Sequence, residues 1–254
     1  MTRDAIIARI DALGRPGIVL NRGLAGVQAS RAAALAWDAT YPEAAFEYRQ
    51  LCAELEAVDQ AIKQRAEAER QVRAVEVQLE RAFGDTASGE RPVAVLDRLT
   101  DTPALGFARA WMESKACWLL LCGATSQGKT VAAVWAMRVV LLGGGSAAYR
   151  PAARIARMSG FDEGAVELAR LARVDLLVVD DVGAESNTAW GSGLLGELLD
   201  ARHLNKKRTV LVSNLKFDAF KARVGERVVE RIAEDGSTHQ LAAGPSLRRK
   251  GKAA

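Results

Sequence analysis

The sequence has few cysteines, and none of them belongs to a spaced pair. The three cysteines are Cys52, Cys117 and Cys122. Their number is odd and no C-x-x-C spacing occurs. Disulfide frameworks and structural zinc sites need paired or clustered cysteines, so this pattern argues against both and favours a reducing cytosol.

Long apolar runs are also lacking. The apolar stretch 131–142 is interrupted by Arg138, and no run approaches the roughly 18 residues that indicate a membrane-spanning helix. The first residues, Met-Thr-Arg-Asp, lead into an amphipathic stretch and not into the apolar core of a signal peptide. These absences predict a soluble protein of the cytoplasm.

Charge of one sign is not abundant either. The net charge is +4; residues 1–89 hold 11 Lys and Arg against 13 Asp and Glu, a net −2, so residues 90–254 carry +6. A basic C-terminal part is compatible with a phosphate-rich partner, but a solvated surface is the simpler explanation of so mild an excess. The length of 254 residues allows one large domain, or one domain with an appendage.

A phosphate-binding loop is the most informative feature that the chain does have. An apolar strand at 118–122 runs into Gly-x-x-x-x-Gly-Lys-Thr, and a helix is expected at 130–142. Glycines let the backbone curl around phosphate oxygens, the lysine reaches the β- and γ-phosphates, and the threonine hydroxyl ligates Mg²⁺. The residues expected to bind ATP are Gly123, Thr125, Ser126, Gln127, Gly128, Lys129 and Thr130.

The N-terminal part is predicted to be all helical. Helices are expected at 3–13, 25–37 and 41–83, and the third is unusually long. Apolar residues step by three and four along it, but Arg65 and Glu69 interrupt the stripe. Such a helix needs a helical hairpin or a partner helix to cover it. The alternative is a surface helix packed on the following domain.

A change of pattern divides the chain. Residues 84–90 have the composition of a linker, so we expect a helical, partner-binding region at 1–89 and a nucleotide-binding domain at 90–254. Strands and helices alternate in the second part, with further elements expected at 146–150, 163–172, 174–179, 193–204 and 209–213. Fully apolar strands in such an alternation predict an α/β fold, in which helices cover both faces of a parallel sheet.

Two adjacent carboxylates follow the most apolar strand. Asp180 and Asp181 end the run Val174–Val179, and such acids are costly at the end of a buried strand unless they meet a cation or a reacting water. We assign Asp180 to the Mg²⁺ shell with Thr130, and Asp181 to activation of the attacking water. Asn214 ends the next β-rich segment and would bond the γ-phosphate or that water; a polar strand cap is the alternative.

Together these motifs resemble the DnaC/IstB group of AAA+ ATPases. The resemblance covers about residues 100–250 and is most specific in Gly-Glu-Arg-Val-Val-Glu-Arg at 225–231, after Ser-Asn-Leu. It implies an AAA+ core, with Arg231 as an arginine finger and Arg227 one helical turn earlier on the same face. A finger acts on a neighbour's nucleotide, so a homo-oligomer is implied. A surface ion pair with Glu226 or Glu230 is the alternative.

The same resemblance assigns two further arginines and shows two departures. Arg248 matches the sensor 2 element, although a leucine precedes it where the family has an aromatic residue, and Arg202 matches another recurrent arginine. Asp181 stands where many AAA+ proteins carry glutamate. The strand at 146–150 ends in Tyr-Arg-Pro, without an Asn or Thr as a switch residue. Either the coupling of hydrolysis to a ligand is therefore expected to differ, or hydrolysis is expected to be slow.

The resemblance implies ATP and Mg²⁺ as cofactors and a DNA-directed function. The leading hypothesis is a helicase loader that grips a replicative helicase through its N-terminal helices and engages single-stranded DNA. The alternatives are a transposition helper, with a transposase as partner, and a coiled-coil adaptor with a nucleotide switch. Arg150, Arg154 and Arg157 are candidate DNA contacts, with a solvated helix face as the alternative, since no aromatic residues lie among them for stacking.

Overall fold

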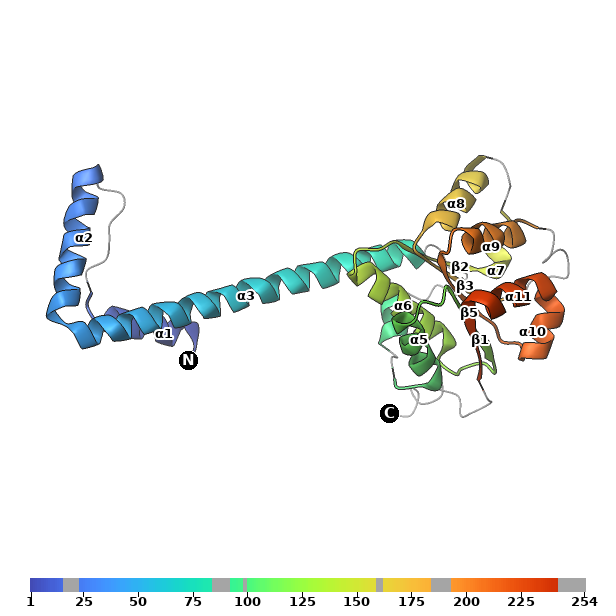
Figure 1. Cartoon of the computed structure of the whole chain (residues 1–254), viewed down its shortest axis with the longest axis horizontal. Coiled ribbons are helices and arrows are strands. Elements are labelled where there is room, and N and C mark those ends of the chain that lie inside the picture. Colours follow the sequence, from blue (N-terminus) through green and yellow to red (C-terminus); the bar gives the residue numbers. More distant parts are fainter. Residues whose placement is uncertain (16–22, 84–91, 98–99, 159–161, 184–192, 242–254) are drawn as a thin grey trace. The chain divides into compact units, whose positions relative to one another are not determined.

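The fold was analysed in a computed structural model, shown in Figure 1, which describes residues 1–15, 23–83, 92–97, 100–158, 162–183 and 193–241. Contacts divide the chain into two compact units, Met1–Gln71 and Val72–Ala254. The expected linker at 84–90 lies outside the described residues, and the division into 1–89 and 90–254 stays a prediction. Within the described part, no helix is long and apolar enough to span a membrane.

The first unit consists of helices, as predicted. Its elements are α1 (Arg3–Ala12), α2 (Gly23–Thr40) and the first part of α3 (Pro42–Phe83). The helix α1 begins after Thr2, whose hydroxyl accepts a hydrogen bond from the Ala5 N–H at 3.4 Å. Pro42 takes the first position of α3, where a missing N–H costs no hydrogen bond.

The helix α1 packs antiparallel on α3. Arg3 pairs with Asp59 at 2.5 Å, and Arg9, two turns further along α1, pairs with Glu47 earlier in α3. Because exposed ion pairs contribute little, burial of Ile6 against this hairpin is the larger stabilising term. The cover predicted for the long helix, by a helical hairpin or a partner helix, is thus supplied by α1 over part of its length.

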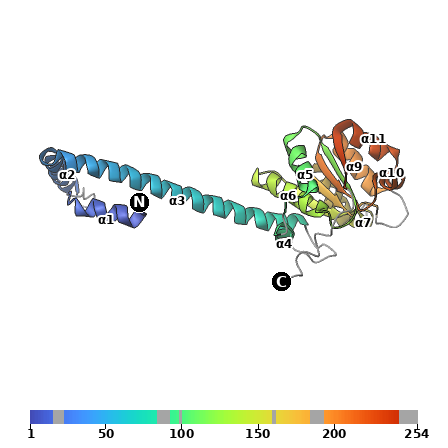
Figure 2. The same ribbon diagram turned by 90° about the horizontal axis from the view of Figure 1, so that it is seen from below.

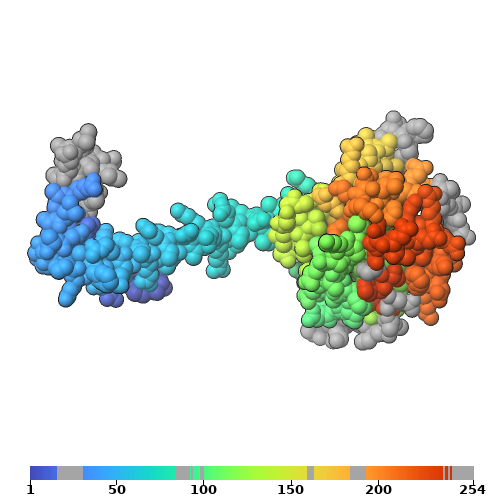
Figure 3. Space-filling model, viewed as in Figure 1, coloured from blue at the N-terminus to red at the C-terminus, as the bar shows by residue number. Residues whose placement is uncertain are grey.

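The middle of α3 has no such cover. Every residue from 60 to 71 is exposed, as the bare cyan stretch of Figure 3 shows. The last turns differ again: Val75, Leu79 and Phe83 are buried in the core of the second unit. Both explanations offered for the long helix, a covering helix and packing on the next domain, therefore apply, each to a different part of it.

The second unit is built on a five-stranded sheet. Its strands are β1 (Trp118–Gly123), β2 (Ala147–Pro151), β3 (Leu176–Asp180), β4 (Arg208–Val212) and β5 (Gly236–Leu241). The strand order is β2-β3-β4-β1-β5, and every pairing is parallel. The strand β4 lies between β1 and β3, so the three strands that carry the predicted motifs end side by side at one edge of the sheet.

Helices cover both faces of this sheet, as Figures 1 and 2 show. Alternate strand residues point into two apolar clusters: Leu119 and Leu121 belong to one, Leu120 to the other. The first face carries the end of α3, α4 (Pro92–Leu96), α5 (Pro103–Glu113) and α6 (Lys129–Leu142). The second carries α7 (Ala152–Ile155), α8 (Asp162–Arg173), α9 (Leu194–Leu204), α10 (Phe217–Val224) and α11 (Glu226–Asp235). This confirms the predicted α/β class.

Several elements of the second unit were not among those expected from the sequence. They include the short helices α4 and α7, the helices α5 and α10, and the edge strand β5. The helix α5 begins after Thr102, whose hydroxyl accepts a hydrogen bond from the Leu105 N–H at 3.1 Å. The strand β5 has a mostly polar sequence, and β1 supplies its backbone partners along one side.

Candidate ATP site

The predicted phosphate-binding loop joins the end of β1 to the start of α6. Gly123 has φ +119°, and a Cβ there would lie 2.2 Å from the carbonyl oxygen of Leu241 in β5. Gly128 has φ +79° and precedes the first residue of α6. Both positions therefore require glycine. The loop leads directly into the N-terminus of α6, where the helix dipole and backbone N–H groups favour phosphate.

Lys129 is folded back into this loop. Its Nζ donates hydrogen bonds to the carbonyl oxygens of Gly123, at 3.0 Å, and Ala124, at 2.6 Å. Burial lowers the pKa of Lys129, and the charge of Asp180 opposes that shift. The acceptors are neutral carbonyls, so a charged phosphate would be a stronger partner for this ammonium group.

The expected magnesium residues come together from two elements. The Thr130 hydroxyl, on α6, donates to Asp180 Oδ2 at 2.9 Å. The Tyr149 hydroxyl, on β2, donates to the same oxygen at 2.5 Å, and the Asp181 N–H donates to Asp180 Oδ1 at 2.7 Å. Burial raises the pKa of Asp180, and the neighbouring Asp181 carboxylate raises it further, whereas these hydrogen bonds oppose the change.

The two residues expected to handle water are also neighbours. Asn214, just after β4, donates from Nδ2 to Asp181 Oδ1 at 2.9 Å, and both side chains are exposed. The Ser213 hydroxyl donates to the carbonyl of Val182 at 2.6 Å, which ties the end of β4 to the turn after β3. Asn214 therefore contacts the proposed base, and its function in hydrolysis stays a prediction.

This donor set suits Mg²⁺. The Thr130 hydroxyl and the Asp180 carboxylate are oxygen ligands within hydrogen-bond distance of each other. Mg²⁺ is commonly held by one or two carboxylates together with waters and substrate phosphates. Within the described ranges, no cluster of three or more His, Cys, Asp or Glu could hold a metal by itself. The residues fit a magnesium ion that arrives with a nucleotide.

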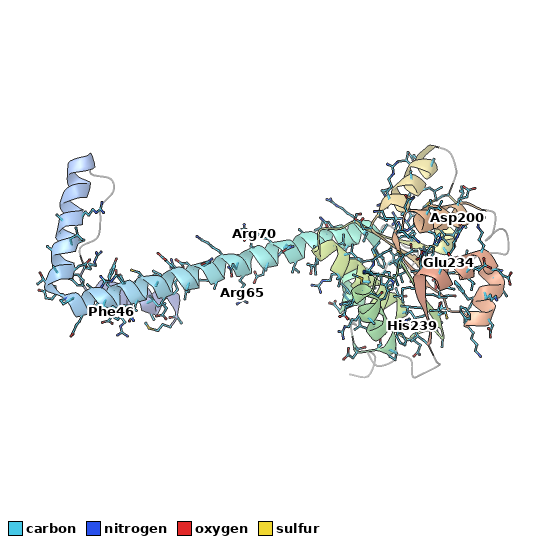
Figure 4. All side chains as sticks on the ribbon, in the orientation of Figure 1. Phe46, Arg65, Arg70, Asp200, Glu234 and His239 are labelled. Carbon is cyan, nitrogen blue, oxygen red and sulfur yellow. The ribbon has the colours of Figure 1, made fainter. Side chains whose placement is uncertain are left out.

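The two arginines of α11 share one partner. Asp200, on α9 and labelled in Figure 4, pairs with Arg227 at 2.6 Å and also with Arg231. The side chain of Arg231 is 14% exposed and that of Arg227 is 71% exposed. Their common face is as predicted. The alternative to an arginine finger was an ion pair with Glu226 or Glu230, and the pair found in the structure is instead with Asp200 of the neighbouring helix α9.

Arg202 is not brought to the site. It is fully buried and donates to the carbonyls of Leu171, at 2.6 Å, and Val174, at 2.9 Å, and to the Thr209 hydroxyl, at 3.0 Å. Burial lowers its pKa to about 10. Thr209 pairs with Trp118, the first residue of β1, so Arg202 lies at the amino ends of the strands, opposite the phosphate loop. Its function is to join α8, α9 and β4.

The candidate DNA-contacting arginines fall into two groups. Arg150 is buried and donates to Glu167 at 2.6 Å and to the Ala82 carbonyl at 2.9 Å. Its prediction as a DNA contact is wrong, because a buried guanidinium bound to a carboxylate cannot meet a phosphate backbone. Arg154 and Arg157 are exposed. Arg248, the proposed sensor 2 residue, lies outside the described residues.

Tyr149 is a site residue that was not predicted from the sequence. The strand end Tyr-Arg-Pro was judged only for the absence of Asn or Thr, yet the Tyr149 hydroxyl contacts Asp180 and its ring stacks on Phe83, with centroids 3.9 Å apart and planes at 10°. A signal was present, since a tyrosine within a buried strand needs a polar partner for its hydroxyl.

The sequence matches the model of a family described as IstB-like ATP binding protein over residues 30–252. The replicative helicase loader DnaC of Buchnera aphidicola subsp. Acyrthosiphon pisum (strain APS) is 32% identical over 62 residues, which are 24% of this chain and 25% of that protein. The uncharacterized protein YdaV of Escherichia coli (strain K12) is 32% identical over 69 residues, 27% of this chain and 28% of that protein. The matched segments thus span about a quarter of these relatives.

Solved structures also resemble the chain. A crystal structure of DnaI has 21% identity and a TM-score of 0.49, and the match covers 60% of this chain and 89% of that one. A crystal structure of the DnaC helicase loader has 20% identity and a TM-score of 0.46, and the match covers 64% of this chain and 95% of that one.

Proposed function

Because the chain belongs to the DnaC/IstB-like family of AAA+ ATP-binding proteins, we propose that it hydrolyses ATP and loads a replicative helicase onto DNA. One observation carries the hydrolysis: contacts run from Thr130 through Asp180 and Asp181 to Asn214. They join the phosphate loop to the ends of β3 and β4, which are the parts that phosphoryl transfer to water requires.

Each residue has a distinct role in this proposal. Lys129 leaves the loop carbonyls to meet the β- and γ-phosphates, and Thr130 and Asp180 hold Mg²⁺, which would supply positive charge at the phosphates. Asp181 orients the attacking water and takes its proton. The Asn214 amide fixes the direction of that carboxylate through its hydrogen bond at 2.9 Å.

The hydrolysis is tested by phosphate release from Asp181→Asn. We expect this variant to bind ATP with unchanged affinity and to turn over about 100-fold more slowly, since general-base catalysis contributes about 10²- to 10⁴-fold. Asp218→Asn, at an exposed position of α10, is the matched control and should keep the normal rate. An Asp181→Asn variant as fast as the original chain would contradict the assignment.

Helicase loading adds a partner and DNA to the proposal. The family match and the DnaC relatives support it, and such a role belongs in the cytoplasm. The full chain should co-purify with a hexameric replicative helicase, and single-stranded DNA should stimulate its ATP hydrolysis. If the chain hydrolyses ATP but binds no replicative helicase, the helicase-loader proposal is refuted and the ATPase proposal stands.

The arginine finger is proposed to act between subunits of a homo-oligomer. Asp200 of the same chain holds Arg231, so this pair must open when Arg231 reaches a neighbour's nucleotide. Arg231→Ala should lower turnover by about 10³-fold. Mixing it with Asp181→Asn should restore part of the activity, because some interfaces then combine an intact base with an intact finger. Mixtures that stay inactive would contradict action in trans.

A transposition helper is the second candidate, and the match to the family described as IstB-like ATP binding protein supports it as well. Such a protein would bind duplex DNA in an ATP-dependent manner and would assist a transposase. ATP-dependent coating of duplex DNA, without helicase binding, would decide for it. A single burst of hydrolysis followed by tight nucleotide retention would instead favour the adaptor with a nucleotide switch.

A further inference from the structure

Tyr149 contacts Asp180, the proposed magnesium ligand, on one side and the end of α3 on the other. Its hydroxyl donates to Asp180 Oδ2 at 2.5 Å, and its ring stacks on that of Phe83, the last residue of α3. All three side chains belong to the second unit and are buried. The geometry therefore forms one continuous path from α3 to Asp180.

We propose that Tyr149 is a positioning residue for Asp180, and that the end of α3 controls its position through Phe83. This rests on the proposed ATP hydrolysis and assigns that site a route by which the helical N-terminal region acts on it. Tyr149 itself touches neither the nucleotide nor the reacting water. It acts by fixing the direction in which Asp180 presents its oxygens.

The hydrogen bonds of Asp180 explain why Tyr149 matters. Tyr149 and Thr130 donate to Oδ2, and the Asp181 N–H donates to Oδ1. The Thr130 hydroxyl is itself an expected Mg²⁺ ligand, so its bond to Asp180 changes when the ion binds. The Tyr149 hydroxyl is not expected to bind the ion, and it can hold the carboxylate in both states. Such outer partners orient the groups that bind a metal.

A second contact ties the same two segments together. Arg150, the neighbour of Tyr149 on β2, donates to the Ala82 carbonyl in the last turn of α3 at 2.9 Å. Glu167 on α8 anchors its guanidinium at 2.6 Å. Two consecutive residues of β2 thus grip the last two residues of α3, so a displacement of this helix end displaces Tyr149 with it.

The position of α3 in the chain explains how the contact between Phe83 and Tyr149 could transmit a signal. The helix Pro42–Phe83 contains residues of both compact units, which divide at Gln71 and Val72. A partner bound to the first unit would act on the same helix that ends at Phe83. The strand β2 has no Asn or Thr at its end to sense a ligand, and Tyr149 would serve that purpose by acting on the first aspartate of the pair.

The test is the affinity of the full chain for a fluorescent ATP analogue, with Mg²⁺ and with EDTA. Tyr149→Phe removes the hydroxyl and keeps the ring against Phe83. With Mg²⁺, we expect this variant to bind the analogue about tenfold more weakly and to need about tenfold more Mg²⁺ for half-saturation. An effect of this size is typical of groups that orient metal ligands. In EDTA, the affinity should not change. Phe83→Leu should raise the half-saturating Mg²⁺ concentration by about threefold. The Tyr149 ring would then lose the aromatic ring that holds it in place, while the Tyr149 hydroxyl remains.

Two controls match these changes. Tyr41→Phe removes a hydroxyl from an exposed tyrosine of the first unit, and Phe107→Leu removes a ring stacked on His239, with centroids 3.8 Å apart. Both should leave the Mg²⁺ dependence unchanged. Thermal unfolding without nucleotide shows whether each variant is folded before binding is compared.

A double-mutant cycle separates a relay from independent effects. If Phe83 acts through the Tyr149 hydroxyl, Phe83→Leu should change nothing further in the Tyr149→Phe background. A Phe83→Leu effect that persists there would overturn the relay, and an unchanged Mg²⁺ dependence in Tyr149→Phe would overturn the positioning function. Failure of the unaltered chain to bind or hydrolyse ATP would instead refute the proposed function.

Discussion

Lys129 and Arg202 are both buried cations, but their surroundings differ. Lys129 meets two loop carbonyls and has Asp180 as a nearby opposing charge. Arg202 meets carbonyl and hydroxyl oxygens that belong to α8 and to the start of β4. Lys129 can exchange its carbonyl partners for a ligand, whereas the N–H donors of the Arg202 guanidinium are already used in structural hydrogen bonds. Substitution of Lys129 should therefore lower nucleotide affinity, and substitution of Arg202 should lower stability.

Lys129→Ala should weaken nucleotide binding. The ammonium group is the cation that the loop holds at the proposed phosphate position, and charge-assisted hydrogen bonds of this kind contribute about 1.5–3 kcal/mol each. We expect the dissociation constant for ATP to rise at least about tenfold, and by about 100-fold if the group makes two such bonds. Calorimetric titration measures it. Lys115→Ala, at an exposed position, is the control, and equal affinity in the two variants would refute the loop assignment.

Arg202→Met should lower stability and spare nucleotide affinity. The change leaves the carbonyls of Leu171 and Val174 buried without their donor, at about 1–3 kcal/mol each. We expect the free energy of unfolding to fall by about 3 kcal/mol or more in urea denaturation. Arg202→Lys should recover only part of it, since one ammonium group lacks the planar fork of donors.

The control for Arg202 is Arg173→Ala. Arg173 is exposed, and its removal should change stability by less than about 0.5 kcal/mol. A normal unfolding free energy in Arg202→Met, or a large loss of ATP affinity with normal stability, would contradict the structural function.

At this scale, motifs predicted correctly which residues lie together, as Thr130 and Asp180 do, whereas single residues outside motifs were harder to place. Spacing alone associated Thr130 with Asp180, because phosphate loops and strand-end aspartates occur together. Arg150 was wrongly predicted to contact DNA, because the presence of an arginine in the sequence does not reveal whether its side chain is buried. Tyr149 and Asp200 escaped notice because their roles depend on which strands and helices become neighbours, and that is a property of the fold.

Among the elements, those with apolar periodicity were predictable. The strands β1 and β3 are almost entirely apolar, and β4 is Arg-Thr-Val-Leu-Val, with two β-branched valines and a threonine. The structure places all three within two residues of the expected bounds. The helix α5 had a usable signal that was overlooked, namely Thr102 as N-cap followed by Pro103. The strand β5 had none, because it forms by pairing at the sheet edge with a mostly polar sequence.

One exposed acid links the starts of three strands. Asp175, just before β3, accepts hydrogen bonds from the Lys207 ammonium at 2.9 Å and from the Ser146 hydroxyl at 2.7 Å. Ser146 and Lys207 directly precede β2 and β4. The hydrogen bond from Lys207 is the main cause that holds the pKa of Asp175 well below its usual range, and the Ser146 contacts add to it.

This shift gives a pH prediction. A carboxyl group whose pKa is lower in the folded state contributes stability above its unfolded pKa of about 3.9, and that contribution is lost as the pH falls toward the folded value. Asp175→Asn should therefore reduce the slope of unfolding free energy against pH below about 4 and lower stability at neutral pH. Urea unfolding at several pH values measures this; an acid slope equal to that of the Asp218→Asn control would contradict it.

For the whole molecule, the burial of the last turns of α3 bears on the position of the domain boundary. The linker-like composition of 84–90 favoured a division at 89/90, but α3 carries its last turns into the core of the second unit. Val75, Leu79 and Phe83 are each less than 5% exposed. A composition signal marks where a chain leaves regular structure, and it does not reveal which neighbouring helix completes a core.

The fragments 72–254 and 90–254 should therefore behave differently. Full burial of a leucine or phenylalanine side chain contributes about 1.5–3 kcal/mol, so loss of Leu79 and Phe83 with Val75 costs on the order of 5 kcal/mol. That approaches the whole stability of many domains, about 5–15 kcal/mol. The shorter fragment also loses the Ala82 carbonyl that accepts from Arg150. We expect 72–254 to unfold cooperatively in urea and to bind ATP, and 90–254 to have a much lower midpoint or no cooperative transition.

Point variants in the full chain separate lost packing from damage caused by truncation. Leu79→Ala should lower the free energy of unfolding of the second unit by about 2–5 kcal/mol, the cost of a buried cavity. Val77→Ala, two residues earlier and 49% exposed, should change it by less than about 0.5 kcal/mol. Equal midpoints for the two fragments, together with equal stability of the two variants, would mean that the last turns of α3 are not part of the ATP-binding domain, and Phe83 would then have no fixed position from which to hold Tyr149.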